Sequence, residues 1–251
     1  MYRSGNPALN DSTFEKSAYK EASWWEDSES NLMSMNGVVD KTALLLTIVT
    51  LTAIAVYLTV PTFLFLSLLG AIVGFVVALI IIFSGSMNPI LICTYAACQG
   101  LFLGGITWII EKQVDAPGLG IVAAVLTLLI LGVMLSIYRA GLISWNKNMQ
   151  IAVTSSMVAI LLIYLVSFIG SFVGFEVPLI HGNGTVGIAF SVFVVGIASL
   201  CLVADFDFIE RGVERGAPKQ LEWRAAFGLL VTLIWLYLEI LKLLAKLASR
   251  R

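Results

Sequence analysis

The feature that most constrains this chain is a series of seven long apolar runs. Each is about 20 residues long, enough for a helix to cross a hydrocarbon core of roughly 30 Å at about 1.5 Å per residue. The runs are Thr42–Val60, Thr62–Phe83, Ile90–Ile110, Leu119–Tyr138, Ile151–Phe172, Val186–Ala204 and Ala225–Leu247. A membrane β-barrel would instead show alternating segments of about 10 residues. With 59% hydrophobic residues, the sequence predicts an all-α polytopic membrane protein, a seven-helix transmembrane bundle.

The links between the runs predict how neighbouring helices pack. Short links force successive spans to run antiparallel, and Pro61 leaves almost no loop between the first two, so we expect a tight hairpin there. The pairs Gly70–Gly74 and Gly100–Gly104 place small residues four apart, a spacing that lets helix backbones approach closely. We interpret both pairs as packing sites. The alternative is that Gly104 and Gly105 form a kink or line a pore.

Residues 1–36 are expected to form a mobile cytoplasmic tail ahead of a seven-span domain over residues 37–251. The tail is rich in Ser, Asn and Glu, has no sustained apolar period, and lacks the apolar core of a cleavable signal peptide. Trp24 and Trp25 either dock at the lipid headgroups or form a stray aromatic pair. Asn10 and Asn183 match the short glycosylation pattern, which is a weak signal.

Lysine and arginine residues indicate the orientation. With seven full spans, ten of them lie in the tail and the even-numbered loops, against five on the other side. The positive-inside rule then places the N-terminus in the cytoplasm. A re-entrant last span would move the four basic residues of the C-terminal segment to the same side, and charge alone does not decide between these two topologies.

Several functional classes lack the residues that they need. The formal net charge of −1 offers no basic surface for nucleic acid. Cys93, Cys98 and Cys201 lie in apolar runs, where buried cysteines act as small hydrophobes, and His181 is the only histidine. We therefore expect no firm metal site and no cofactor. No motif offers a nucleophile with its base, so an enzyme is not expected.

Acidic residues in or beside the apolar runs are the candidate functional site, because an ionisable side chain at membrane depth costs roughly 2.5–3.5 kcal/mol. Glu239 lies near the middle of the last run and shares a helix face with Lys242 and Lys246. It either pairs locally with Lys242 while Lys246 reaches the interface, or points into the bundle as a cation or proton site. Asp205 and Asp207 end the sixth run, and we expect at least one of them in a polar loop. The alternative for Asp207 is a solvated helix end.

Short motifs in three of the runs carry a family resemblance. They are Ala97-Cys-Gln-Gly-Leu-Phe-Leu-Gly-Gly-Ile106, Leu202-Val-Ala-Asp-Phe-Asp207 and Leu236-Tyr-Leu-Glu-Ile-Leu241. Their order and spacing within seven spans resemble the Bax inhibitor-1 family of transmembrane Bax-inhibitor-motif proteins. The opening segment Arg3-Ser-Gly-Asn-Pro-Ala-Leu9 is similar to that of bacterial members, so a bacterial cytoplasmic membrane is the expected location.

The resemblance implies a last helix at the centre of the bundle and a pH-sensitive calcium leak. In similar proteins the leak is gated by a proton shared between an acid on the sixth helix and one on the last, which match Asp205 and Glu239 here. Two carboxylates held close cannot both ionise easily, and oxygen ligands suit calcium, so both residues are possible calcium ligands. Asp207 and Gln99 complete the candidate pathway.

Three departures from the family pattern concern this site. The acid of the last run is Glu rather than the Asp of some members, Gln99 stands where many members carry Glu, and the second run has no basic residue to pair with Asp205. Depth is a further constraint, since Glu239 lies well inside its run whereas Asp205 ends its own. For the two to meet, the sixth helix must continue through Glu210–Arg215 to a stop at Gly216, or the last helix must break.

A second function needs no pore. A bundle of this kind could act by binding and regulating a membrane protease or another membrane partner, and the acids would then be structural. The sequence alone leaves both functions open.

Overall fold

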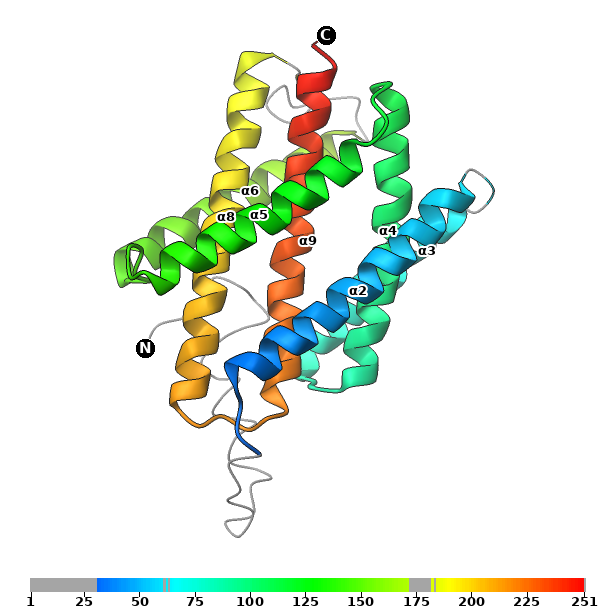
Figure 1. Ribbon diagram of the computed structural model, residues 1–251. Helices are drawn as coiled ribbons and strands as arrows, with labels where there is room; N and C mark the ends of the chain where they lie inside the picture. The colour runs from blue at the N-terminus through cyan, green and yellow to red at the C-terminus, as the bar shows by residue number, and fades with distance from the viewer. Residues whose placement is uncertain (1–30, 61, 63, 172–181, 183, 251) are drawn as a thin grey trace. The chain divides into compact units, whose positions relative to one another are not determined.

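A computed structural model describes residues 31–250 except 61, 63, 172–181 and 183. Within these residues it contains seven long helices (Figure 1). They are α2 (Met35–Thr59), α3 (Leu64–Ser84), α4 (Pro89–Gln113), α5 (Leu119–Arg139), α6 (Lys147–Ser171), α8 (Thr185–Glu214) and α9 (Leu221–Ala248). All seven are long and apolar enough to span a membrane, which confirms the predicted class. The predictions for Asn10, Trp24, Trp25, His181 and Asn183 lie outside the described residues.

Two helices extend well beyond their apolar runs. Helix α2 begins at Met35, where the Ser34 side chain accepts a hydrogen bond from the Gly37 amide and caps the helix. Helix α8 continues past Ala204 to Glu214, which is the continuation that the depth argument requires. Gly216 follows the end of the helix, and its φ of +63° places it in the left-handed region. The Gly216 and Ala217 amides donate back to Val213 and Gly212, a glycine C-cap that satisfies the last carbonyls.

Helix α9 is the most buried of the seven spans. In its most apolar window 61% of the residues are buried, against 50% for α8 and less for the others. It is also one unbroken helix of 28 residues, which is about 42 Å and enough for a full span. A high buried share is what the expected central position requires, and an unbroken α9 favours a seventh full span over a re-entrant one.

The chain divides into two compact units. One extends to Ile109 and includes Asp205–Val231, and the other comprises Ile110–Ala204 and Thr232–Arg251. The first unit therefore holds α2, α3, most of α4, the end of α8 and the start of α9. The second holds the end of α4, α5, α6, most of α8 and the end of α9. Each unit is described by itself below.

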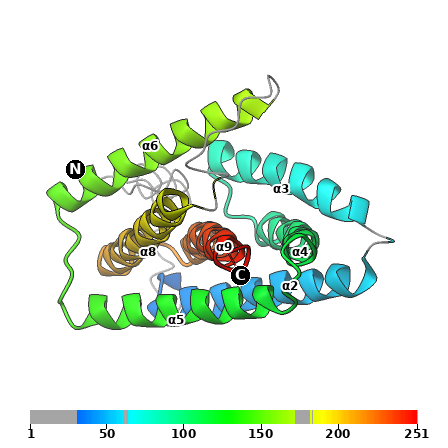
Figure 2. The same cartoon turned by 90° about the horizontal axis from the view of Figure 1, so that it is seen from above.

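In the first unit, α4 lies between α2 and α3, which diverge from their connection (Figure 2). The prediction that the first two spans pack as a tight hairpin is therefore wrong along most of their length, where α4 separates them. Gly100 and Gly104 face α2 so closely that an added Cβ would overlap Thr52 Oγ1 and the Ala53 carbonyl respectively. The α3 glycines face α4 instead: a Cβ on Gly70 would lie 2.6 Å from the Cys98 carbonyl oxygen. Glycine rows on α3 and α4 thus allow three backbones to pack closely.

The same geometry bears on the proposed kink or pore at Gly104 and Gly105. Helix α4 runs without a break from Pro89 to Gln113. A Cβ on Gly105 would overlap Ser67 Oγ, and that hydroxyl donates to the Leu101 carbonyl of α4 at 2.9 Å. In this structure the two glycines therefore lie against neighbouring helices within a continuous helix.

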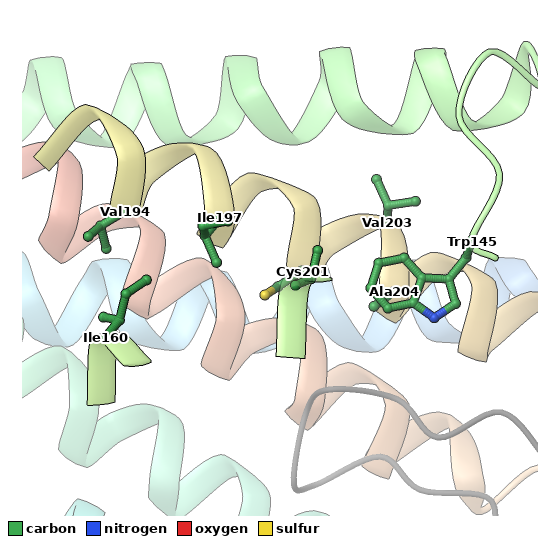
Figure 3. Packing of buried hydrophobic residues seen from close by; sticks show 8 residues of the cluster. Trp145, Ile160, Val194, Ile197, Cys201, Val203 and Ala204 are labelled. Atoms are coloured by element: carbon green, nitrogen blue, oxygen red, sulfur yellow. The ribbon is translucent and has the colours of Figure 1, made fainter. Parts of the chain in front are cut away.

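The second unit is held together by an apolar cluster on α8 (Figure 3). Val194, Ile197 and Cys201 follow one face of α8 and pack with Ile160 of α6 in one buried cluster. The indole of Trp145, from the connection before α6, covers the end of this cluster near Ala204. Cys93, Cys98 and Cys201 are free thiols, and Cys201 Sγ lies 3.3 Å from Met157 Sδ, so Cys201 acts here as a small apolar side chain.

A methyl group at Gly100 should disrupt the α2–α4 contact. Gly100→Ala places a Cβ onto Thr52 Oγ1 and the Val49 carbonyl, so we expect a loss of about 1–3 kcal/mol of unfolding free energy. Gly132→Ala in α5 is the matched control, because no atom lies within 4 Å of its Cβ, and it should raise stability by up to about 1 kcal/mol. Denaturant unfolding in detergent micelles measures both. Equal effects would show that the close approach at Gly100 is absent.

Candidate functional site

Glu239 is buried near the middle of α9, and both of its carboxylate oxygens have partners in the second unit. The Tyr164 hydroxyl of α6 donates to Oε2 at 2.9 Å, and Lys242 Nζ donates to Oε1 at 3.0 Å. Lys242 Nζ also lies 4.7 Å from the centroid of the Tyr164 ring, within cation–π range. Each of the three side chains thus contacts the other two: the ammonium group of Lys242 neutralises the Glu239 carboxylate, and the Tyr164 phenol donates a hydrogen bond to it.

Packing and burial restrict Tyr164 and Glu239 more than they restrict Lys242. The Tyr164 ring packs edge-on against Phe190 of α8, with centroids 6.5 Å apart. Lys242 keeps 42% of its side chain exposed, whereas Glu239 keeps 2%. The ammonium group can therefore move away from a carboxylate that cannot follow it.

Lys246 lies one turn further along α9 and has different partners. Its side chain is 9% exposed, and its ammonium donates to the Gly187 carbonyl at 3.0 Å and to the Ser191 hydroxyl at 2.9 Å, both on α8. The local Glu239–Lys242 pair considered from the sequence is therefore present. Lys246 has two oxygen acceptors on α8, near the ends of both helices, and its position at the membrane interface stays a prediction.

Asp205 and Asp207 both lie within α8, so the expectation that at least one sits in a polar loop is wrong. The helix continues for nine residues beyond Asp205 to Glu214, because Arg211 neutralises Asp207 at i,i+4 and the glycine cap comes only at Gly216. Asp205 is fully buried, whereas Asp207 is partly exposed and forms an ion pair with Arg211 at 2.5 Å. As two-residue spacing requires, the two carboxylates point in different directions.

Asp205 belongs to the first unit and Glu239 to the second, so their pairing stays a prediction. The helix bounds give the number of residues between each acid and the segment that connects α8 to α9. Nine residues of α8 follow Asp205, and eighteen residues of α9 precede Glu239. Measured along each helix from its end at the connecting segment, these are about 14 Å and 27 Å.

Gln99 occupies a packing position on α4. It is half-buried, and its amide nitrogen would lie 3.1 Å from a Cβ on Gly74 of α3. The absence of a side chain at Gly74 thus provides the space that the Gln99 amide uses. Among the described residues, no group of three or more His, Cys, Asp or Glu side chains is arranged to hold a metal ion.

The first unit contains a second buried carboxylate, Glu222, in the first turn of α9. It accepts hydrogen bonds from the amide and hydroxyl of Ser34, at 2.9 and 3.1 Å, and forms a short ion pair with Lys41 of α2. Lys41 Nζ lies 5.4 Å from the centroid of the Trp223 ring. One carboxylate therefore holds the N-terminus of α2 against the N-terminus of α9.

Backbone pairing reinforces this junction. Leu32 and Pro218 form an isolated antiparallel bridge. The Met33 amide donates to the Ala217 carbonyl at 2.7 Å, and the Lys219 amide donates to the Asn31 carbonyl at 2.8 Å. We call Asn31–Ser34, Lys41 and Ala217–Glu222 together the N-terminal clasp. Residues of the expected tail that the structure describes are thus fixed to the segment before α9.

Comparison with protein families agrees with the motifs in α4, α8 and α9. The family model described as Bax inhibitor 1 like matches residues 6–249, nearly the whole chain. The chain belongs to the Bax inhibitor 1 like family. No curated protein matches it.

Three polar residues of this Bax inhibitor 1 like protein were not predicted from its sequence. Tyr164 lies in an ordinary apolar run, and nothing in that run indicates that its hydroxyl meets an acid 75 residues later. Glu222 has a local signal, because an acid suits the first turn of a helix. Neither Glu222 nor Lys41 reveals its partner in the sequence, since 181 residues separate them.

Removing the charge of Glu222 should weaken the N-terminal clasp. Glu222→Gln keeps the shape but leaves Lys41, which is only 17% exposed, without its counter-charge, so we expect a loss of about 2 kcal/mol of unfolding free energy. Glu214→Gln, on an exposed position, should change stability by less than about 0.5 kcal/mol. Denaturant titration of the purified protein measures both values. If Lys41→Met combined with Glu222→Gln cost the sum of the two single changes, the ion pair would contribute nothing.

Proposed function

We propose that this protein is a cation leak of the membrane in which it resides, with calcium as the permeating ion and protonation of Asp205 and Glu239 as its gate. The observation that carries the proposal is Glu239, a carboxylate buried in the middle of a spanning helix. Such a group is costly at membrane depth and is a functional candidate for that reason. Family membership and the buried Asp205 support the same function.

The gate follows from the electrostatics of carboxylates in a medium of low dielectric constant. If Asp205 and Glu239 approach one another, ionisation of one disfavours ionisation of the other, and the pair holds one proton in common. Loss of that proton adds a negative charge to the pathway and attracts a hard cation that prefers oxygen ligands. Flux should therefore depend on pH through the pair and not through either acid alone.

Lys242 adds a feature that the family resemblance does not supply. Its ammonium lies at the Glu239 carboxylate, in the position that a mobile cation would take. In its own unit Glu239 also has the Tyr164 phenol beside it and Lys246 about two turns away on the same helix. We propose that a cation reaches Glu239 only when the Lys242 ammonium moves away, which its exposed side chain permits.

We further propose a bacterial cytoplasmic membrane and a cytoplasmic N-terminus. The first rests on the opening segment Arg3–Leu9, which resembles bacterial members. The second rests on the excess of lysine and arginine in the tail and the even-numbered loops.

Calcium flux through the purified protein in liposomes, measured across pH, tests the gate. Asp205→Asn and Glu239→Gln keep the shape of each side chain and remove its charge, so each should make flux insensitive to pH. The double variant should add little, because coupled sites act as a unit. Asp207→Asn is the control and should change the response less, since Asp207 pairs with Arg211.

Two results would contradict this assignment. A wild-type pH response in both acid variants, together with its loss in Asp207→Asn, would move the sensor to Asp207. No flux from any form, together with a partner trapped by crosslinking in native membranes, would favour the other candidate: a protein that binds and regulates a membrane protease or another membrane partner.

Removal of the Lys242 ammonium should raise cation flux. Lys242→Met leaves Glu239 without its tethered cation, so a mobile cation can take its place, and we expect an increase of severalfold at fixed pH. Lys246→Met is the matched control. It removes the same charge one turn further along α9 than Lys242, from an ammonium group that donates hydrogen bonds to α8, so its effect on flux should be smaller. Equal flux in both variants and the wild type would show that Lys242 is not in the pathway.

A further inference from the structure

The first unit contains a cavity of about 560 Å³ beside the N-terminal clasp. It lies where the first turns of α2, α4 and α9 and the segment before α9 come together. Its polar lining comprises Asn31, Lys41, Asn88, Lys219 and Gln220, and Trp223 forms an apolar wall. Nothing in the proposed leak uses these residues.

The charges around the cavity favour an anion. Among the described residues of its lining, Lys41 and Lys219 carry a charge, and both are cationic. Glu222 lies next to Lys41 but is fully buried and already accepts bonds from Ser34 and Lys41. An ammonium group has three donors, so Lys41 can hold Glu222 and still offer a hydrogen bond to a ligand.

The neutral lining suits an anionic oxygen group as well. The side chains of Asn31, Asn88 and Gln220 are amides, which offer N–H donors without a negative charge. Helices α4 and α9 both begin at this cavity, so the positive ends of two helix dipoles lie beside it. The helix dipoles, the side-chain amides and the ammonium groups therefore all favour a negatively charged ligand.

The position of the cavity indicates which anion reaches it. Its residues lie at or next to the first turns of three spanning helices, which is where an apolar span meets the polar headgroup layer. Tryptophan is enriched at that level, and basic pockets between spanning helices bind the headgroups of anionic lipids. A soluble metabolite would not need the apolar wall that Trp223 provides.

We propose that this cavity binds the phosphate group of an anionic lipid headgroup, with Lys219 and Lys41 as its cationic contacts and Trp223 against the glycerol and upper acyl carbons. Lys41 belongs to the N-terminal clasp and lies over the Trp223 ring, so a bound lipid adds contacts between α2 and α9. The site is independent of Asp205 and Glu239.

Isothermal titration of the full chain in a neutral detergent tests the site with three probes. Dioctanoyl phosphatidylglycerol should bind saturably, and dioctanoyl phosphatidylcholine should bind at least about fivefold more weakly, as loss of one unit of charge at a near-surface lysine implies. Sodium phosphate is the third probe. Binding by the lipid alone identifies a headgroup site, whereas saturable binding of sodium phosphate with equal strength keeps the phosphate site and makes the free anion its ligand.

Variants at exposed positions test the contacts without disturbing the core. Lys219→Gln should weaken phosphatidylglycerol binding about fivefold, and Lys219→Arg should retain it. Gln220→Glu places an acid in the lining and should abolish binding, while an acid before α9 also suits the helix N-terminus and so preserves folding. Lys147→Gln, which removes the same charge from an exposed position on α6, is the control and should leave affinity within twofold.

Two outcomes would overturn the proposal. One is equal binding of the anionic and zwitterionic lipids. The other is an equal effect of Lys219→Gln and Lys147→Gln, since binding would then follow the net charge of the protein instead of this cavity.

Discussion

Every charge in the apolar spans must find a partner within the protein, and α9 shows how this constraint shapes the molecule. Four of its charged residues are buried: Glu222, Arg224, Glu239 and Lys246. Three of them are held by residues distant in sequence, Glu222 by Ser34 and Lys41, Glu239 by Tyr164, and Lys246 by Gly187 and Ser191. Hydrocarbon offers no hydrogen bonds, so a helix with such groups is stable only where other helices supply them. A last helix with four buried charged residues is therefore also the most buried helix.

Close packing of the neighbouring helices depends on the opposite kind of residue. Association of apolar helices within lipid gains little from the hydrophobic effect, so contacts depend on how near the backbones can come. Gly100 and Gly104 on α4 bring it against α2, and Gly70 does the same from α3. The absence of side chains at these positions thus serves the first unit as much as the polar contacts of α9 do.

Hydropathy could predict the seven helices because each span must match the thickness of the bilayer. It left the end of α8 open, since the polar segment Glu210–Arg215 fits either a loop or a helix continuation that stops at Gly216. The structure has the continuation, in which Asp207 pairs with Arg211. The local Glu239–Lys242 pair was accessible from helical spacing alone. Tyr164 and Lys41 were not, because the choice of partner is made by packing between segments 75 and 181 residues apart. The hairpin expected at Pro61 failed for a similar reason: a short connection limits where two helices start, and α4 determines how far they separate.

The N-terminal clasp has a consequence for how the chain is made. A ribosome delivers Ser34 and Lys41 early, yet the carboxylate that they bind belongs to Glu222, at the start of the last helix. Until that helix is synthesised, the first span has neither its counter-charge nor its backbone bridge at Pro218. Closure of the clasp therefore requires that translation has passed the start of α9, and a product truncated before α9 would keep Lys41 without its counter-charge and the start of α2 without its backbone bridge.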